Sequence, residues 1–490
     1  MRALLVGGFV RDTLLGLNPH DRDYVVIGQS PESMRALGYV LSGEHFPVFR
    51  HPVTQEEYAL ARSEKSTGHG HGAFECAWEG VTLEEDLLRR DLTINAMAFA
   101  EDGTLIDPYG GAADLEAGVL RQVSRHFQED PLRILRVARF AARYQFTVHP
   151  GTMALMRRMV KQDMLETLSP ERLWQETQKA MLTDHPGIYF DVLDACGALE
   201  RVFPELHCLK DIPQRPDYHA EGDTWVHTRM VLEQACAFSA ELSDARKLRV
   251  RMAALLHDLG KANTPFEELW ADNGDLIGSH HGHEDLERFG PPLQALSERI
   301  KMPGDVRQFA TSVALVHQKV HSIFKAGGHG LVSLYQTLDL SRKLRHDPYI
   351  LDDVALACAA DTPGCQDLHL FDDVTVACDA DDGVCEDPHI LDDVALACAA
   401  DNYGRLTLLK DGSKVAPTSY HQADYFKKAM LTIHAVDPGT VIKAVLAKGH
   451  GLKTAKEQLL ARQRGSVKPM IAEHRALGDD AIAEMLGTRA

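Results

Sequence analysis

Two aspartates near the N-terminus have the spacing of a metal-binding pair. Asp21 and Asp23 directly precede the β-branched run Val25-Val26, and residues i and i+2 of a strand point to the same face. Two aligned carboxylates can hold one or two Mg²⁺ ions, which prefer oxygen ligands and share their site with substrate phosphates. Because an Asp-x-Asp pair is often only a solvated surface pair, this interpretation depends on a second signal nearby.

That second signal is a glycine pair that interrupts an apolar run. The segment Leu4–Val6 ends at Gly7-Gly8, and a helix-like segment that contains Arg11 follows it. Backbone N–H groups at such a turn and at the helix N-terminus can face a phosphate chain. Gly8 and Arg11 are therefore candidate phosphate-binding residues, although a glycine pair by itself is more often only a turn.

Together, the two signals resemble a known signature. The pattern Gly-Gly-x-Val-Arg-Asp at 7–12, followed by Asp-x-Asp at 21–23, is similar to that of nucleotidyltransferases of the polymerase-beta type. The resemblance implies a catalytic head with a small mixed sheet. It also implies that Asp21 and Asp23 bind the Mg²⁺ ions that activate a primer 3′-hydroxyl and steady the leaving pyrophosphate.

A second motif follows at Arg89-Arg90-Asp91. An Arg-Arg-Asp triplet alone is usually an exposed helix end. In this context it resembles the second motif of the same family, which implies that Arg90 contacts the triphosphate and Asp91 a ribose hydroxyl. Either Asp91 or Glu57 could add a third metal carboxylate, and the sequence does not decide between them.

An arginine-bearing helix is predicted next. Asp130 is expected at its cap and Pro131 in its first turn. Arginines at 133, 136, 139 and 143 fall within roughly a third of the circumference at 100° per residue, and the opposite face is apolar. Such a stripe is either a binding surface or merely a solvated face, and periodicity alone does not decide.

The spacing of Asp130 and Arg133 adds a more specific signal. A carboxylate and a guanidinium one turn apart can address the edge of cytosine or adenine together while mispairing with guanine or uracil. Glu129-Asp130-x-x-Arg133 resembles the base-selecting motif of class II CCA-adding tRNA nucleotidyltransferases, in which Arg136 and Arg139 match nucleotide-binding positions. The resemblance implies untemplated addition of CCA to the tRNA 3′ end from CTP and ATP.

The middle of the chain carries a separate histidine-rich pattern. His227 precedes the adjacent pair His257-Asp258, and a histidine cluster at 280–283 follows. A single histidine on an apolar helix is more often a core residue than a ligand, but this combination resembles HD phosphohydrolases. Imidazole and carboxylate ligands suit transition metals, whose bound water becomes the nucleophile. We expect His283, rather than His281, to complete the set.

The HD pattern brings the resemblance closest to the bacterial multifunctional CCA proteins. It implies additional 2′,3′-cyclic phosphodiesterase, 2′-nucleotidase and phosphatase activities that use Ni²⁺, Co²⁺ or Mn²⁺. Family-like closure of this site needs a later aspartate, for which Asp401 is the candidate. A repeat of period 20 intervenes, however: 347–361 recurs at 387–401, with a diverged copy at 367–381. Asp361, Asp381 and Asp401 therefore remain alternatives.

Composition limits the class of protein. The chain has 490 residues, 44% of them hydrophobic and 25% charged, and no apolar run long enough for a membrane span or a signal peptide. Nine cysteines without a C-x-x-C pair favour reduced thiols, so a cytoplasmic protein is expected. Although the net charge is −19, residues 346–401 hold 15 acidic and no basic residues, whereas 121–180 hold 11 basic and six acidic ones. A basic patch for nucleic acid is therefore available.

These signals require an α+β fold in four segments. We predict a nucleotidyltransferase head at 1–125 with strands at 23–28, 58–61 and 104–107, and a polar loop at 62–72. An all-α neck at 126–215, an all-α HD domain at 220–405 interrupted by the repeat, and a helical tail at 406–490 follow. The expected partners are tRNA, ATP and CTP, and the protein is expected to be a monomer or homodimer.

Two rival functions share parts of this pattern. A bacterial poly(A) polymerase has the same head motifs and adds only A, but the HD pattern argues against it. A regulatory or RNA-binding protein with a silent head is disfavoured because both Asp21 and Asp23 are present.

Overall fold

The computed structural model describes residues 1–19, 21–42, 48–66, 74–215, 219, 221–271, 276, 280–321, 328–337, 407–408, 414–415, 422–448 and 452–476. The chain divides into two compact units, Met1–Val202 and Phe203–Ala490. The tandem repeat lies outside the described residues, and so do the three candidate aspartates at 361, 381 and 401.

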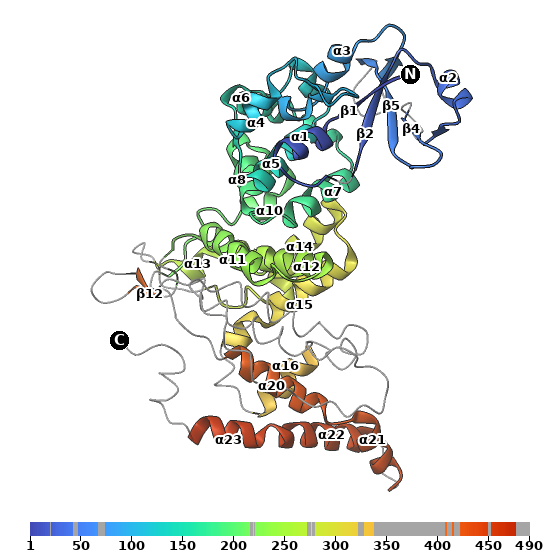
Figure 1. Ribbon diagram of the computed structural model, residues 1–490. Coiled ribbons are helices and arrows are strands. Elements are labelled where there is room, and N and C mark those ends of the chain that lie inside the picture. Colours follow the sequence, from blue (N-terminus) through green and yellow to red (C-terminus); the bar gives the residue numbers. More distant parts are fainter. Residues whose placement is uncertain are drawn as a thin grey trace. The chain divides into compact units, whose positions relative to one another are not determined.

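A mixed sheet lies at one side of the first unit (Figure 1). β1 (Arg2–Val6) pairs antiparallel with β2 (Asp23–Ile27), which pairs parallel with β5 (Glu57–Leu60). The strand order is β3-β4-β5-β2-β1-β8-β9, where the remaining strands are β3 (Val40–Leu41), β4 (Val48–Arg50), β8 (Ala98–Phe99) and β9 (Leu105–Ile106). The small mixed sheet predicted from the sequence is thereby confirmed.

Both faces of this sheet are covered, because successive residues of β2 point to opposite sides. Val25 belongs to one core cluster, which α3 (Leu83–Leu88) covers through Leu83 and Leu87. Val26 belongs to the other, into which α2 (Pro31–Ala36) inserts Met34. Both helices begin with a capping box, which satisfies their first free N–H groups and fixes where they start.

The predicted strands match β2, β5 and β9 to within one or two residues at each end. The predicted loop at 62–72 was partly wrong, because β6 (Ser63–Ser66) pairs antiparallel with β7 (Phe74–Ala77). The serine and lysine residues of this segment have low strand propensity, so the sequence gave little sign of a strand here. In the folded chain, backbone pairing with β7 outweighs that weak propensity.

Helices complete the first unit, and the arginine-bearing helix is α5. It begins at Leu132, ends at Tyr144 and packs against α7 and α8 through its apolar face. The other elements are α1 (Gly8–Leu14), η1 (Thr93–Asn95), α4 (Gly111–Glu116), η2 (Arg125–Glu129), α6 (Pro150–Lys161), η3 (Met164–Thr167), α7 (Pro170–Met181), α8 (Gly187–Cys196) and α9 (Ala198–Val202). The predicted neck also contains a two-residue strand, β11 (Thr147–Val148), parallel to β10 (Val119–Leu120).

The described part of the second unit is almost wholly helical. Its centre is α12 (Asp244–Leu256), which packs between α11 (Thr224–Phe238) and α15 (Gly304–His321). The other helices are α10 (Pro204–His207), η4 (Leu259–Asn263), α13 (Phe266–Leu269), α14 (Leu286–Ile300), α16 (Gly328–Thr337), α20 (Gln422–His434), α21 (Pro438–Leu446), α22 (Leu452–Ser466) and α23 (Lys468–Ala476). A strand pair, β12 (Thr407–Leu408) and β13 (Lys414–Val415), lies before α20.

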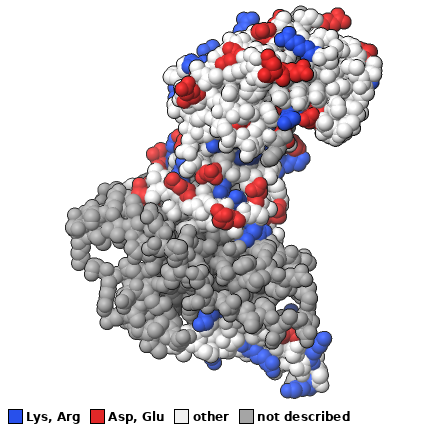
Figure 2. Space-filling model, viewed as in Figure 1, with Lys and Arg blue, Asp and Glu red and all other residues white. Residues whose placement is uncertain are grey.

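One described stretch, Lys428–Leu446, has the length and mean hydropathy of a membrane span. It is divided between α20, which ends at His434, and α21, whose cap is Asp437. The Asp437 carboxylate accepts hydrogen bonds from the backbone N–H groups of Gly439 and Thr440, so a charged group lies within the stretch. The following helix, α22, carries the exposed residues Lys453 and Lys456. Figure 2 shows several Lys and Arg side chains on the face of the molecule that it draws.

Candidate functional sites

The first unit contains a polar cavity of about 850 Å³ between the glycine turn, the start of β2, α5 and α7. Ten residues predicted from the sequence line it: Gly8, Arg11, Asp21, Asp23, Arg90, Asp91, Asp130, Arg133, Arg136 and Arg139. Glu129 is not among the lining residues. Its carboxylate contacts His126 Nδ1 at 2.7 Å instead, so the structure does not bring the first residue of the Glu-Asp-x-x-Arg motif to the cavity.

The glycine turn makes room for arginines. Gly7 has φ +69°, a conformation that favours glycine, and a Cβ there would lie 2.9 Å from Arg90 Nη1. Arg11 is almost buried, and it donates from Nη1 to Asn95 Oδ1 at 2.6 Å and from Nε to Asp12 Oδ1 at 2.7 Å. These contacts fix the Arg11 guanidinium at the base of the cavity.

The predicted metal carboxylates lie at the edge of the cavity. Asp23 is the first residue of β2 and pairs in register with Glu57 on β5. Desolvation raises the pKa of Asp23, and the negative charges of Glu57 and Asp21 raise it further against the opposing charge of Arg90. Carboxylate oxygens are the donors that Mg²⁺ prefers, so these acids have the chemistry of a Mg²⁺ site. Among the described residues, however, they do not form a group whose ligand atoms all lie within 4.8 Å of one another. Glu57, rather than Asp91, is the acid that the structure places beside Asp23.

Asp91 instead forms a buried network. Its Oδ1 accepts from Asn95 Nδ2 at 2.9 Å and from the Leu92 N–H at 2.8 Å, and its Oδ2 accepts from Arg136 Nε at 2.8 Å. Burial by itself raises the pKa of Asp91, but Arg136 and Asn95 more than offset this and hold it well below its usual range. Asp91 therefore stays ionised and fixes Arg136 on the cavity wall.

The predicted base-selecting pair faces the cavity, but other groups hold each member in place. Asp130 Oδ2 accepts from Arg172 Nη2 at 2.8 Å, while Oδ1 accepts from the Leu132 N–H at 3.1 Å. The two terminal nitrogens of Arg133 donate to the backbone carbonyls of His126 and Arg89 at 2.7 and 2.8 Å. Both side chains are therefore positioned before a nucleotide arrives.

Arg139 is held from two sides. Its Nε donates to Glu176 Oε2 at 2.6 Å, and its guanidinium lies 4.4 Å from the centre of the Phe140 ring. Arg11 lies over the same ring at 5.1 Å. Arg136 lies 5.5 Å from the same ring, so Phe140 supports three cations that line the cavity, by the attraction between a cation and an aromatic face.

Some lining residues had no role in the sequence analysis. They are Asn95, Arg143, Arg172 and Lys179, together with Asp12. Arg143 was visible on the predicted arginine stripe. Arg172 and Lys179 are seven residues apart on α7 with Glu176 between them, so helical periodicity of charged residues could have found them.

In four histidines of the second unit, the contacts show that Nδ1 carries the ring proton. In His257, His283 and His317, Nδ1 lies 2.5 to 2.8 Å from the backbone carbonyl three residues earlier. Because a carbonyl only accepts, Nδ1 must donate in these rings. In His227, Nδ1 contacts the Glu221 carboxylate at 2.9 Å and donates in the same way. In the neutral rings, every Nε2 is therefore left as an acceptor.

These four Nε2 atoms surround the Asp258 carboxylate. Oδ2 lies 3.2 Å from His257 and 3.7 Å from His227. Oδ1 lies 3.1 Å from His283 and 3.8 Å from His317. Acceptors gathered this closely repel one another unless a proton or a cation lies among them, and imidazole with carboxylate is a donor set for transition metals. These residues therefore fit a divalent metal.

Neighbouring groups shape this site. Lys261 Nζ lies 2.6 Å from Asp258 Oδ2 and donates to Gln214 Oε1 at 2.8 Å. Burial by itself raises the pKa of Asp258, but His257 and Lys261 hold it well below its usual range. A Cβ on Gly260 would lie 1.9 Å from the His283 carbonyl oxygen, so only glycine allows η4 to approach His283 this closely.

The structure places the predicted residues of this site as follows. His227, His257, Asp258 and His283 come together and are buried, while His281 is exposed. The predicted fifth ligand, Asp401, lies outside the described residues. The sequence analysis missed His317, which lies outside the quoted motifs, as well as His219 and Glu221.

Comparisons with known families agree with this architecture. Residues 3–121 match the poly(A) polymerase head domain, and residues 145–209 match a domain described as a probable RNA and SrmB-binding site of polymerase A. Residues 224–298 match the HD domain.

Individual relatives span most of the chain. The multifunctional CCA protein of Tolumonas auensis is 46% identical over 370 residues, which cover 75% of this chain and 85% of the relative. The multifunctional CCA protein of Acinetobacter baumannii is 47% identical over 368 residues, covering 74% and 84%. A solved structure described as a CCA-adding enzyme, apo form II, is 22% identical with a TM-score of 0.48, over 68% of this chain and 72% of that one. The two CCA proteins are 46% and 47% identical to this chain, and the matches cover 85% and 84% of their lengths, so this chain belongs to the multifunctional CCA protein family.

Proposed function

We propose that the first unit adds C, C and A to the 3′ end of tRNA from CTP and ATP without a nucleic-acid template. The observation that carries this proposal is the cavity in which the Asp21 and Asp23 carboxylates, the glycine turn and the pair Asp130–Arg133 face the same space. The names of the relatives, which are multifunctional CCA proteins, support it.

Each group in the cavity has a part in the proposed reaction. Asp21 and Asp23 would hold Mg²⁺, which when bound supplies the positive charge that activates the 3′-hydroxyl and stabilises pyrophosphate. Arg11, Arg90 and Arg136 bind the triphosphate by charge-assisted hydrogen bonds. Because nucleotidyl transfer depends mainly on positioning and charge, side chains held before substrate arrives lower its barrier.

The base-reading step depends on the Asp130 carboxylate and the Arg133 guanidinium. The carboxylate accepts from the amino group of cytosine or adenine, and the guanidinium donates to a ring nitrogen or to the cytosine carbonyl. Guanine and uracil present the opposite pattern at these positions. The pair thereby replaces a template base.

The experiment is the extension of a tRNA that lacks CCA by the purified protein with Mg²⁺, CTP and ATP. We expect a product longer by C, C and A, and its loss in Asp21→Ala and Asp23→Ala. Addition of A alone, repeatedly and to generic RNA, would indicate a poly(A) polymerase, to which the match of the head domain also corresponds. No incorporation with Mg²⁺ would leave a silent RNA-binding protein as the better account.

We also propose that the second unit is a metal-dependent phosphohydrolase that acts on 2′,3′-cyclic phosphodiesters, 2′-nucleotides and other phosphate esters. The match to the HD domain and the convergence of four imidazoles on Asp258 support it. His227, His257, Asp258, His283 and His317 would hold Ni²⁺, Co²⁺ or Mn²⁺, which when bound lowers the pKa of a water molecule and makes it a nucleophile. Lys261 carries a positive charge next to Asp258 and neutralises part of its charge.

A further inference from the structure

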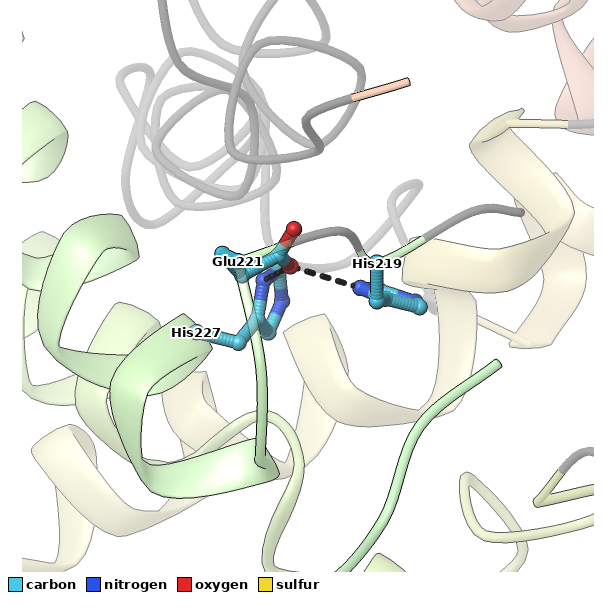
Figure 3. Close-up of side chains that lie close together, drawn as sticks. All are labelled: His219, Glu221 and His227. Atoms are coloured by element: carbon cyan, nitrogen blue, oxygen red, sulfur yellow. Dashed lines mark hydrogen bonds and ion pairs between the residues drawn. The ribbon is translucent and has the colours of Figure 1, made fainter. Parts of the chain in front are cut away.

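A buried glutamate lies next to the HD site, between two histidine rings. Glu221 Oε1 accepts from His227 Nδ1 at 2.9 Å and from His219 Nδ1 at 2.8 Å. Figure 3 shows the carboxylate between the two rings, with His227 approaching from α11. The Glu221 side chain is only 1% exposed, so these contacts form away from water, where a charge-assisted hydrogen bond is strong.

Glu221 supplies a contact that the backbone supplies elsewhere in the site. The Nδ1 atoms of His257, His283 and His317 are each held by the backbone carbonyl three residues earlier. His227 lies in the first turn of α11, where Nδ1 instead meets the Glu221 side chain. Without that carboxylate, the His227 ring could rotate or adopt the other tautomer, which would turn a proton toward Asp258.

We propose that Glu221 is the positioning residue of the HD site, which holds His227 with Nδ1–H turned away and Nε2 turned toward Asp258. The proposal rests on the metal-dependent phosphohydrolase function proposed above. An ionised carboxylate on Nδ1 also makes the imidazole a better electron donor, which strengthens its bond to a metal. His219 is the second donor to the same oxygen and fixes the carboxylate itself.

The geometry distinguishes this role from direct metal binding by Glu221. The Glu221 carboxylate lies at Nδ1 of His227, whereas the Asp258 carboxylate lies at Nε2, 3.7 Å away. These two nitrogens point in different directions from the ring. An ion bound by His227 Nε2 beside Asp258 is therefore separated from Glu221 by the imidazole, and Glu221 acts on it through His227.

The test is a Co²⁺ titration of the full-length protein, followed by the visible absorption of the bound ion. We expect Glu221→Ala to weaken Co²⁺ binding by about 10- to 100-fold and to alter the spectrum, as loss of such supporting carboxylates does. Glu221→Gln retains an oxygen that can accept from His227 but lacks the charge, so it should lose less. The matched control is Glu233→Gln, which removes an exposed charge from α11, the helix that carries His227, and should bind Co²⁺ like the wild type.

Two results would overturn the proposed role of Glu221. Wild-type affinity and spectrum in both Glu221 variants would overturn the proposal. A lower unfolding temperature of the metal-free protein with unchanged Co²⁺ binding would do the same, because it indicates a structural role alone. If Glu221→Ala does not fold, Glu221→Gln decides. His257→Ala distinguishes failure of the proposed metal site from failure of the positioning role of Glu221. If His257→Ala leaves Co²⁺ binding unchanged, the proposal that these histidines bind a metal is wrong.

Discussion

Asp91 Oδ2 and Arg136 Nε lie 2.8 Å apart, although 45 positions separate the two residues in the chain. The contact joins the segment after α3 to the arginine face of α5. It places a guanidinium from α5, the helix that carries Arg133 of the base-selecting pair, against the same cavity that Asp21 and Asp23 border. The position of Arg136 therefore depends on the Asp91 carboxylate, which lines the same cavity.

We predict that Asp91→Asn weakens nucleotide use without abolishing catalysis. The amide cannot match the charge of the carboxylate, so Arg136 loses its strongest partner and moves more freely. The KM for CTP and ATP should rise about tenfold, which corresponds to about 1.4 kcal/mol, while kcat falls less. Steady-state incorporation assays measure both. Asp102→Asn, which changes an exposed aspartate of the same unit, is the control and should leave both constants unchanged.

The same pair predicts how stability depends on pH. The pKa of Asp91 in the folded protein is lowered, so its ionised form stabilises the fold at any pH above the ordinary aspartate pKa of about 4. This contribution is lost as pH falls below that value toward the folded pKa, because the unfolded chain takes up the proton first. The difference in unfolding temperature between wild type and Asp91→Asn should be constant from about pH 5 to 8 and shrink below about pH 4. A difference that grows on acidification would contradict the assignment.

Ten of the residues predicted from the sequence line one cavity, and they could be found because they sit in short, ordered motifs. Gly8, Asp21 and Arg90 belong to patterns in which spacing and local conformation are tied together. The charged periodicity of α7 marks Arg172 as one of several charged side chains on that helix, but its contact with Asp130 depends on how α7 packs against α5, which no local pattern encodes. Glu129 shows the reverse error, since it belongs to the motif but its carboxylate contacts His126 on η2.

The HD site also depends on contacts between residues far apart in the chain, which spacing in the sequence does not reveal. His257-Asp258 is a recognisable pair, but His317 lies on α15, 34 residues after His283, which lies in the turn before α14. Only the fold brings their Nε2 atoms to 3.0 Å. Glu221 precedes α11 in a segment without a periodic pattern, so its contact with His227 could not be read from spacing. The division into four segments and the role of Asp401 stay predictions.

Two substitutions at the contact between Asp130 and Arg172 should reduce base selectivity to different extents. Asp130→Ala removes the acceptor for the amino group, so discrimination against UTP and GTP should fall by about 10- to 100-fold, the effect of losing one hydrogen bond to a charged group. Arg172→Ala keeps the carboxylate and removes the side chain that orients it, so its selectivity should fall less. Competition assays with all four nucleotides measure both. Equal selectivity in wild type and Asp130→Ala would reject the assigned role, while unchanged pyrophosphate inhibition shows that the triphosphate site is intact.

The two units should be separable by a substitution in the HD site. His257→Ala removes an imidazole whose Nε2 lies 3.2 Å from Asp258 Oδ2, so a divalent metal loses one ligand and Asp258 one neighbour. We expect hydrolysis of 2′,3′-cyclic AMP in the presence of Ni²⁺ or Co²⁺ to fall at least 100-fold. CCA addition should be unchanged, because its proposed residues belong to the first compact unit. The exposed His281 provides the matched control, since His281→Ala should retain both activities. A parallel loss of CCA addition in His257→Ala, with the first unit still folded, would mean that one site serves both reactions.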